Sequence, residues 1–332
     1  TTEFLDAVRH MENCLRRRKL DRAREIAREA AHDGLFGPRQ YNALLDAFGK
    51  AGRLAEVEDI FLEFDLVGMR RDVATHSILI SAYGKAGKVD LAESSMARMR
   101  EEGVRPNAFT YSALIEAYGR AGRLEEAKRV FRCMPENGVL PNVVAYNALM
   151  KVFVKRGRIN EAFSLAEEMD HVGGRKPDVV TYGTLIDACS KARDADKAFE
   201  VFDMMCESDV KPNRVCYASL IDACSKSQQP ERAFDVLKRM KLANTPPDLF
   251  AYNALIDACG RAKIVDRAFM VYEEIIDVGL RPDKVTFNAL ISACGRARDL
   301  TRAFEALDAM TRVHHIVPDR HTYNSLIDAC GK

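Results

Sequence analysis

Apolar residues recur along the chain three or four positions apart, which is the spacing of amphipathic helices. Tyr252, Leu255, Ile256 and Cys259, for example, share one face of a helix. Small residues such as Ala-Gly at 51–52 follow each such segment and suit a tight turn. A second apolar-periodic segment comes after the turn. The pattern therefore predicts short helices joined in pairs, as helical hairpins.

The same hairpin is repeated through the chain. Successive anchors in the first helix are 35 or 36 residues apart, at Tyr41, His76, Tyr111, Tyr146, Tyr182, Tyr217, Tyr252, Phe287 and Tyr323. In seven of the eight complete repeats a Pro such as Pro106 follows the second helix and is predicted to end it. In the two 36-residue units, the extra residue lies between Met169 and Pro177 and between Met310 and Pro318, which predicts an insertion in the loop between repeats.

One such hairpin cannot bury its apolar faces alone, so neighbouring hairpins must stack. The sequence therefore predicts an all-α fold, a right-handed α-solenoid superhelix of tandem 35-residue helix–turn–helix repeats. We expect a degenerate helical hairpin over residues 1–37 that caps the array, and the start of a truncated ninth repeat over 320–332. Eight complete repeats are expected between them, at 38–72, 73–107, 108–142, 143–178, 179–213, 214–248, 249–283 and 284–319.

Composition narrows the classes of protein. Apolar residues make up 47% of the 332 residues, which is enough for a continuous core. The 50 Lys and Arg nearly balance 49 Asp and Glu, so any basic surface must be local. No run of 18 apolar residues occurs, so no membrane span is predicted. The N-terminus lacks an initiator Met and does not resemble a leader peptide, and the last repeat is incomplete, so we expect a fragment or processed form of a longer protein.

Five of the nine cysteines share one slot, seven residues after the anchor, where the other repeats carry an aromatic residue. They are Cys189, Cys224, Cys259, Cys294 and Cys330. We predict that they pack as small hydrophobic side chains and do not pair, since each repeat holds one. No CxxC motif occurs, and no metal site or cofactor is predicted.

A basic residue stands nine positions after every anchor. These residues are Lys50, Lys85, Arg120, Lys155, Lys191, Lys226, Arg261, Arg296 and Lys332. One explanation is that a cation near the C-terminus of a helix complements the helix dipole. The other is a ladder of positive charge that matches the backbone of a polyanion. Both can hold together.

Two polar positions vary together from repeat to repeat. They are the residue after the anchor and the last residue of the repeat, which is also a good N-cap for the next helix. Wherever the pair is complete, Asn at the first position is followed by Asp at the second, as in Asn42 and Asp72. Ser77 and Ser112 are each followed by Asn. This correlation predicts that the two positions contact one ligand unit together.

At these residues the chain resembles the pentatricopeptide repeat family, of the P type. The resemblance covers residues 38–332 and rests on Val-Val-Ala-Tyr-Asn-Ala-Leu at 143–149, Gly-Arg-Leu-Glu-Glu-Ala at 122–127 and Val-Arg-Pro-Asn at 104–107. It implies sequence-specific binding of single-stranded RNA, one base per repeat. It also implies a role in organellar RNA processing, stabilisation or translation, in the chloroplast or alternatively in the mitochondrion.

The resemblance also implies a role for each site residue. Base-reading residues would be Asn42, Asp72, Ser77, Asn107, Ser112, Asn142, Asn147, Asp178, Gly183, Asn213, Ala218, Asp248, Asn253, Asp283, Asn288, Asp319 and Asn324. Base-sandwiching residues would be Arg39, Ala74, Phe109, Val144, Val180, Val215, Phe250, Val285 and His321. The first eight residues of the basic column would contact phosphates.

The family's pairings imply an address in the RNA. Asn with Asp favours U and Ser with Asn favours A. Gly183 with Asn213 weakly suggests A, and Ala218 with Asp248 weakly suggests G. The implied site is 5′-UAAU(A)(G)UU-3′.

Other classes of function fit the sequence less well. The chain has no phosphate-binding loop, zinc-ligand spacing or nucleophile with a His partner, so we expect no enzyme and no small-molecule substrate. The alternative is a protein-binding helical-repeat scaffold. The related 34-residue protein-binding repeats carry a Trp signature, and this chain has no Trp. Any protein partners are expected to bind regions outside this chain.

Overall fold

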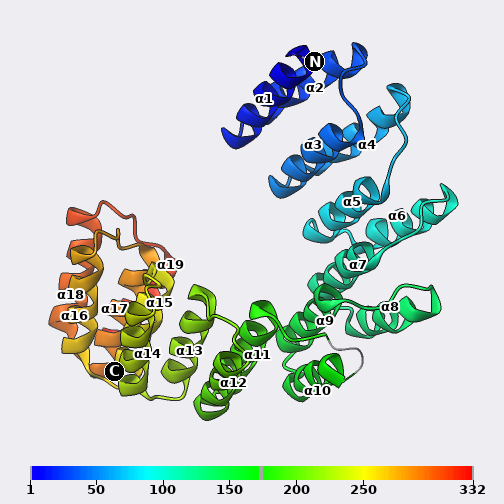
Figure 1. Ribbon diagram of the computed structural model, residues 1–332. Helices are drawn as coiled ribbons and strands as arrows, with labels where there is room; N and C mark the ends of the chain where they lie inside the picture. The colour runs from blue at the N-terminus through cyan, green and yellow to red at the C-terminus, as the bar shows by residue number, and fades with distance from the viewer. Residues whose placement is uncertain (1, 172–174, 331–332) are drawn as a thin grey trace. The chain divides into compact units, whose positions relative to one another are not determined.

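The computed structural model describes residues 2–171 and 175–330, and within these ranges it contains helices, turns and loops but no strand (Figure 1). The predicted all-α fold of helical hairpins is confirmed. The chain divides into two units, which we describe separately. Unit 1 comprises Thr1–Glu161 and Leu165–Lys176, and unit 2 comprises Ala162–Ser164 and Pro177–Lys332.

Unit 1 consists of successive helical hairpins. The first pairs α1 (Thr2–Arg16) with α2 (Leu20–His32) and corresponds to the expected N-terminal hairpin. The following pairs are α3 (Pro38–Lys50) with α4 (Leu54–Leu66), α5 (Val73–Lys85) with α6 (Val89–Glu101), α7 (Ala108–Ala121) with α8 (Leu124–Glu136), and α9 (Val143–Lys155) with α10 (Ile159–His171).

Unit 2 repeats the arrangement. Its pairs are α11 (Val179–Ala192) with α12 (Ala195–Glu207), α13 (Arg214–Lys226) with α14 (Pro230–Leu242), α15 (Leu249–Arg261) with α16 (Val265–Asp277), and α17 (Lys284–Ala297) with α18 (Leu300–Asp308). The π-helical turn η1 (Ala309–Val313) extends α18, and α19 (Arg320–Cys330) follows. No described helix has the length and hydropathy that crossing a membrane requires.

Within each unit, the first helices of consecutive hairpins pack on one another in a row, as α3, α5, α7 and α9 do in Figure 1. The core lies between this row and the second helices. Anchors such as Tyr41 and Tyr252 are fully buried, and so are small residues of the second helices such as Ala92 and Ala268. The absence of a larger side chain at these Ala positions lets the two helices of a hairpin approach closely.

Most first helices begin at a side-chain cap. The carboxylate of Asp72 accepts a hydrogen bond from the backbone N–H of Thr75 at 2.8 Å, and Asn107 caps α7 in the same way. The second helices end earlier than predicted. α6 stops at Glu101, five residues before Pro106, and the chain turns through Gly103 with a φ of 75°. The prediction that the Pro ends the second helix is therefore wrong, because a left-handed residue closes the helix first.

The extra residue of the last 36-residue unit does not lengthen the loop. It is accommodated at the end of the second helix by η1, since a π-helical turn holds one more residue than an α-helical turn. The predicted loop insertion is wrong for this repeat. His314 follows η1, and its Nε2 lies 3.0 Å from the hydroxyl of Tyr272. The corresponding segment between Met169 and Pro177 includes residues 172–174, which lie outside the described residues.

The cysteine slot is buried in four of its five members, namely Cys189, Cys224, Cys259 and Cys294, and none of the described cysteines forms a disulfide. Burial raises the pKa of the Cys189 thiol to about 12, so this thiol stays protonated at neutral pH. The expectation of burial is wrong for Cys330, which is exposed at the end of α19. Only α17 and α18 pack against α19 among the described elements, which leaves this end of the helix open.

Glycine sets the distance between consecutive first helices. A Cβ atom built on Gly260 of α15 would lie 2.7 Å from Cβ and 2.9 Å from Cα of Ala293 in α17. Gly84 of α5 meets Ala117 of α7 in the same way, at 2.6 Å from its Cβ. These distances are too short for any side chain, so the helices are in backbone contact at this slot.

We predict that Gly260→Ala lowers the free energy of unfolding by about 1–3 kcal/mol, because the added methyl group must push α17 away from α15. Gly49→Ala is the matched control, since its Cβ would lie 3.4 Å from that of Ala82. There the helix propensity of Ala should leave stability unchanged or raise it by up to about 1 kcal/mol. Urea denaturation followed by circular dichroism measures both, and equal effects would contradict the packing argument.

Candidate functional site

One face of the first helices carries exposed side chains that the fold does not use. At the position two residues before each anchor, all nine predicted sandwiching residues are exposed. Phe109, Val144, Val180, Val215, Phe250 and Val285 are large and apolar, and Phe250 is 62% exposed. A regular row of exposed apolar side chains is a feature of binding surfaces.

The two covarying polar positions contact each other directly. Asn42 Nδ2 donates a hydrogen bond to Asp72 Oδ1 at 3.0 Å, and Asn253 Nδ2 donates to Asp283 Oδ1 at 3.4 Å. Each pair joins consecutive hairpins. An amide donor facing a carboxylate acceptor explains why Asn and Asp occur together, so the correlation has a cause within the protein.

A third residue, which the sequence reasoning missed, fixes the orientation of the reading side chain. The hydroxyl of Thr75 donates to Asn42 Oδ1 at 2.8 Å, and that of Thr322 donates to Asn288 Oδ1 at 2.7 Å. Ser77 Oγ lies 2.7 Å from Thr110 Oγ1. The signal was a Thr directly before the anchor in five of the repeats, at Thr75, Thr110, Thr181, Thr286 and Thr322.

The two polar positions differ in depth. At the first position Asn42, Ser77, Ser112, Asn147, Gly183, Ala218 and Asn253 are buried, Asn288 is half-buried and Asn324 is exposed. At the second position Asp72, Asn107, Asn142 and Asn213 are exposed, and Asp178, Asp248, Asp283 and Asp319 are half-buried. Where it holds Asn or Ser, the buried first position therefore forms a polar floor between first helices that pack on each other, and the second position forms its rim.

A hollow in unit 2 brings the two kinds of predicted residue together. It has a volume of about 470 Å³, within the range of small-molecule pockets. Phe250 and Val285 line it with Asn253, Asp283 and Asn288, and His321 completes the wall from α19. Apolar walls over a polar floor can hold a planar ring and hydrogen-bond its edge.

The amide of Asn253 is less constrained than that of Asn42. Its bond to Asp283 is long at 3.4 Å, and its Oδ1 is buried without any hydrogen-bond partner among the described residues. A buried acceptor without a partner costs about 1–3 kcal/mol. A ligand that offers a donor at this point would remove that cost.

The basic column is more varied than the sequence suggested. Lys191 pairs with Asp187 at 2.7 Å, and Lys226 pairs with Asp222 at 2.6 Å. Lys50 pairs with Asp46, and Arg261 pairs with Asp257. In each case the acid stands four residues before the cation, a spacing that places both on one face of the helix. Lys332 lies outside the described residues.

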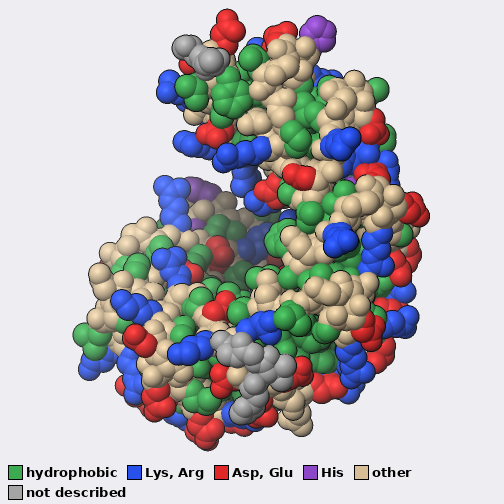
Figure 2. Space-filling view, turned by 45° about the vertical axis from the view of Figure 1, so that its right-hand side comes forward, with side chains coloured by type: hydrophobic (Ala, Val, Ile, Leu, Met, Phe, Trp, Pro, Cys, Tyr) green, Lys and Arg blue, Asp and Glu red, His purple; other side chains and the backbone are tan. Residues whose placement is uncertain are grey.

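Three other cations of the column, Lys85, Arg120 and Lys155, are exposed and form no ion pair with any described residue. Figure 2 shows Lys and Arg interspersed with Asp and Glu over the face that it draws, in line with the net charge of +1. Whether a cation of the column is free to bind a ligand therefore depends on its own neighbouring side chains.

Among the described carboxylates that pair with cations of the basic column, Asp257 accepts the most hydrogen bonds. It accepts hydrogen bonds from Arg261 at 2.7 Å, Arg296 at 3.0 Å and Ser225 at 2.9 Å, and it joins α13, α15 and α17. Burial alone would raise the pKa of this carboxyl, but the two guanidinium groups and the hydroxyl outweigh burial and hold the pKa below its usual value. Its ionised form therefore stabilises the folded state.

We predict that the contribution of Asp257 to the free energy of unfolding is lost at acid pH. A carboxylate whose pKa is lower in the folded state contributes stability above its unfolded pKa of about 3.9, and loses it as the pH falls through the folded value. The stability difference between the wild type and Asp257→Asn should be present at pH 6 and shrink below about pH 4. Asp203→Asn, at an exposed carboxylate with no ion pair among the described residues, is the control. A difference independent of pH, measured by urea denaturation, would refute the assignment.

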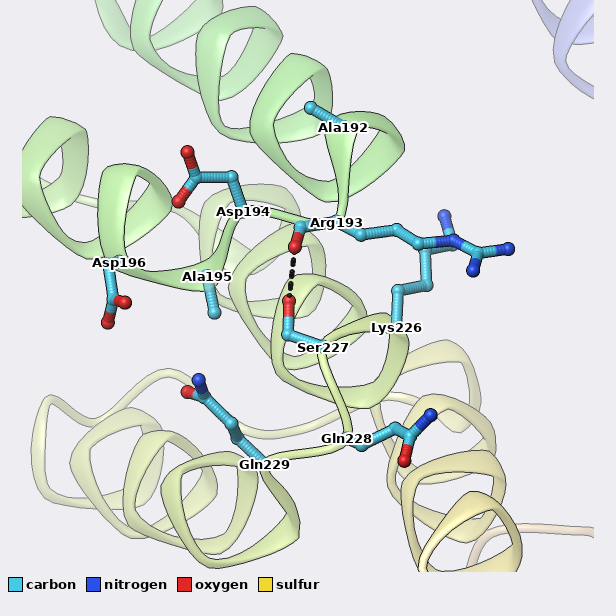
Figure 3. A pocket seen from close by; sticks show the side chains of 9 residues that line it. All are labelled: Ala192, Arg193, Asp194, Ala195, Asp196, Lys226, Ser227, Gln228 and Gln229. Carbon is cyan, nitrogen blue, oxygen red and sulfur yellow. Dashed lines mark hydrogen bonds between the residues drawn. The ribbon is translucent and has the colours of Figure 1, made fainter.

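A second hollow of unit 2, of about 530 Å³, lies at the interhelix turns (Figure 3). Ser227 Oγ donates to the carbonyl oxygen of Arg193 at 2.9 Å and joins the two turns across it. Asp194 and Asp196 stand on the opposite side of the view from Arg193 and Lys226. Of the predicted site residues only Lys226 lines this hollow, so it is separate from the row of reading positions.

No group of three or more His, Cys, Asp or Glu side chains suited to a metal ion occurs in residues 2–171 and 175–330. Several polar side chains of the reading positions and of the basic column instead form ion pairs between a cation and a carboxylate, or hydrogen bonds between an amide and a carboxylate.

Comparison with known families agrees with this architecture. The model described as PPR repeat family matches residues 141–191, 177–226, 212–261, 247–296 and 282–332. The pentatricopeptide repeat domain matches residues 59–121 and 110–156, and the PPR repeat matches residues 41–68. The chain therefore belongs to the pentatricopeptide repeat family. A comparison with curated proteins gave no match.

Solved structures show the same fold. The chain is similar to maize PPR10 in complex with an 18-nt psaJ RNA element, with 23% identity and a TM-score of 0.74 over 96% of this chain and 45% of that one. It is also similar to yeast Rmd9p in complex with a 16-nt target RNA, with 14% identity and a TM-score of 0.52 over 99% of this chain and 75% of that one. The chain thus spans somewhat less than half of the PPR10 chain.

Proposed function

We propose that the chain binds single-stranded RNA along the exposed face of its first helices. The observation that carries this proposal is the hollow between Phe250 and Val285, with the Asn253–Asp283 pair at its floor. Membership of the pentatricopeptide repeat family supports it, as do the RNA complexes of PPR10 and Rmd9p. Each base would insert between the sandwiching side chains of consecutive hairpins, most of which are apolar, and meet one pair of reading positions.

One base per repeat then follows the P-type repeats at 38–72, 73–107, 108–142, 143–178, 179–213, 214–248, 249–283 and 284–319. The proposed address is 5′-UAAU(A)(G)UU-3′, read in the same direction as the chain. In this scheme the Asn253–Asp283 pair reads the seventh base, uracil. The N3–H of uracil is a donor that suits the unpartnered Asn253 Oδ1, and a carbonyl of the base can accept from Nδ2.

The chain would act by occupying RNA, with no catalytic step of its own. Organellar RNA processing, stabilisation or translation each need only such binding, in the chloroplast or alternatively in the mitochondrion. A protein-binding scaffold is the alternative. It would be favoured by binding of a protein partner that changes little with salt, whereas RNA binding must weaken as salt increases.

The proposal is tested by titrating the chain into fluorescent UAAUAGUU RNA and into an eight-nucleotide poly-C RNA of equal charge. We expect the first to bind at least about tenfold more tightly, a difference of about 1.4 kcal/mol. Fluorescence anisotropy gives both dissociation constants. Equal affinities would reject base-specific readout, and no binding of either RNA would reject the proposed function.

A change of code at one repeat tests the register. Asn253→Ser combined with Asp283→Asn should change the preferred seventh base from U to A, with a reversal of about tenfold in relative affinity, because the Asn–Asp pair is replaced by the Ser–Asn pair of other repeats. The first base is the internal control. It faces the unaltered Asn42–Asp72 pair and should still be preferred as U. An unchanged preference at the seventh base would exclude this register.

A further inference from the structure

The cations of the column differ in the acid that accompanies them. In α3, α11, α13 and α15 the residue four positions earlier is Asp, and each pair forms an ion pair. In α9 that position holds Lys151, so Lys155 has a cation there in place of the Asp of the other helices. The repeat pattern is therefore reversed at one place, where a second cation stands beside the first.

The reversal coincides with a hollow between α7 and α9. Arg120, Lys151 and Lys155 line this hollow of about 280 Å³, together with the carboxylate of Glu116. Gly119 also lines it, and a Cβ built there would lie 2.3 Å from Cγ2 of Val152. Because α7 and α9 approach so closely, cations from two helices surround one space. All three are exposed and make no ion pair with any described residue.

The net charge of the column cations and of the residues four positions before them differs in the same way between two groups of helices. On α5, α7 and α9, the four cations Lys85, Arg120, Lys151 and Lys155 face the single carboxylate of Glu116, which leaves a net charge of +3. On α11, α13, α15 and α17, four cations of the column face three carboxylates, which leaves +1. The cations of these four helices are Lys191, Lys226, Arg261 and Arg296, and the carboxylates are Asp187, Asp222 and Asp257.

A phosphate responds to the whole local charge. Beside Lys226 it would also meet the carboxylate of Asp222, which lies 2.6 Å from the ammonium group, so attraction and repulsion largely cancel. Lys226 is also bound to Ser190 at 3.1 Å, and moving it toward a ligand would break both contacts. Beside Lys151 and Lys155 the one lining carboxylate, that of Glu116, forms no ion pair with either cation, and three cations surround it.

We propose that the hollow formed by Arg120, Lys151 and Lys155 is the principal phosphate-binding site of the chain for a single-stranded RNA, with Lys151 as an additional phosphate contact. This inference rests on the proposed RNA binding and refines it. The paired cations of α3, α11, α13 and α15 mainly hold neighbouring side chains in place. The RNA backbone is thus anchored at the third and fourth repeats.

The salt dependence of binding tests the proposal. The dissociation constant of the full chain for UAAUAGUU RNA is measured from about 50 to about 300 mM KCl, where each phosphate contact adds about 0.7 to the slope of log Kd against log salt. Lys151→Gln and Lys155→Gln should each lower the slope by about 0.7. Lys191→Gln and Lys226→Gln are the matched controls at paired positions, and should change it by less than half as much.

A gain of contact provides the complementary test. Asp222→Asn releases Lys226 from its ion pair and should raise the slope by up to about 0.7. Circular dichroism before titration checks that each variant is folded. An unchanged slope in Lys151→Gln, or equal slope changes in Lys155→Gln and Lys226→Gln, would overturn the anchoring site while leaving RNA binding intact. Absence of RNA binding by the wild type is a different result, and it would overturn the proposed function as well.

Discussion

Direct contact between consecutive first helices is the constraint on which the rest of each unit depends. Where Gly84 meets Ala117, and where Gly260 meets Ala293, no side chain separates the two backbones. This contact fixes how far one hairpin stands from the next. Each position of the repeat then recurs at a regular place, and equivalent side chains of neighbouring hairpins come within hydrogen-bonding distance.

The reading positions follow from this spacing. Asn42 reaches Asp72 only because the end of a repeat, where the next first helix begins, is held beside the first helix of that same repeat, and Thr75 is placed by the same cap. The protein thus satisfies most of its own polar floor before any ligand binds. Asn253 is the exception, since its Oδ1 has no partner among the described residues. Side chains that already form hydrogen bonds with one another are held rigidly, so RNA binding requires little reorganisation of these positions.

Much of this architecture could be predicted from the sequence, because each repeat is stabilised mainly by contacts with its neighbours and the period therefore sets the helices. The anchors, the caps and the exposed apolar row all follow from spacing along one helix. The N-terminal hairpin was also visible in the pattern. These features depend on local propensity and on burial, which a single sequence records well.

The missed features depend on contacts between hairpins or on small differences in backbone geometry. The π-helical turn at Ala309–Val313 and the early end of α6 could not be inferred from a Pro several residues later. The neutralisation of Lys226 by Asp222 has a sequence signal, an acid four residues before the cation, but spacing alone does not determine whether the two side chains form an ion pair. Spacing along the chain identifies which residues recur, whereas three-dimensional contacts decide which of them are available.

The proposed recognition of RNA depends most on the polar pair and the apolar walls acting together on one base. A crystal structure of the chain with UAAUAGUU RNA tests this directly. We expect the seventh base between Phe250 and Val285, with its edge within hydrogen-bonding distance of the Asn253 amide. RNA bound away from this hollow, or a base stacked there with its edge turned from Asn253, would contradict it.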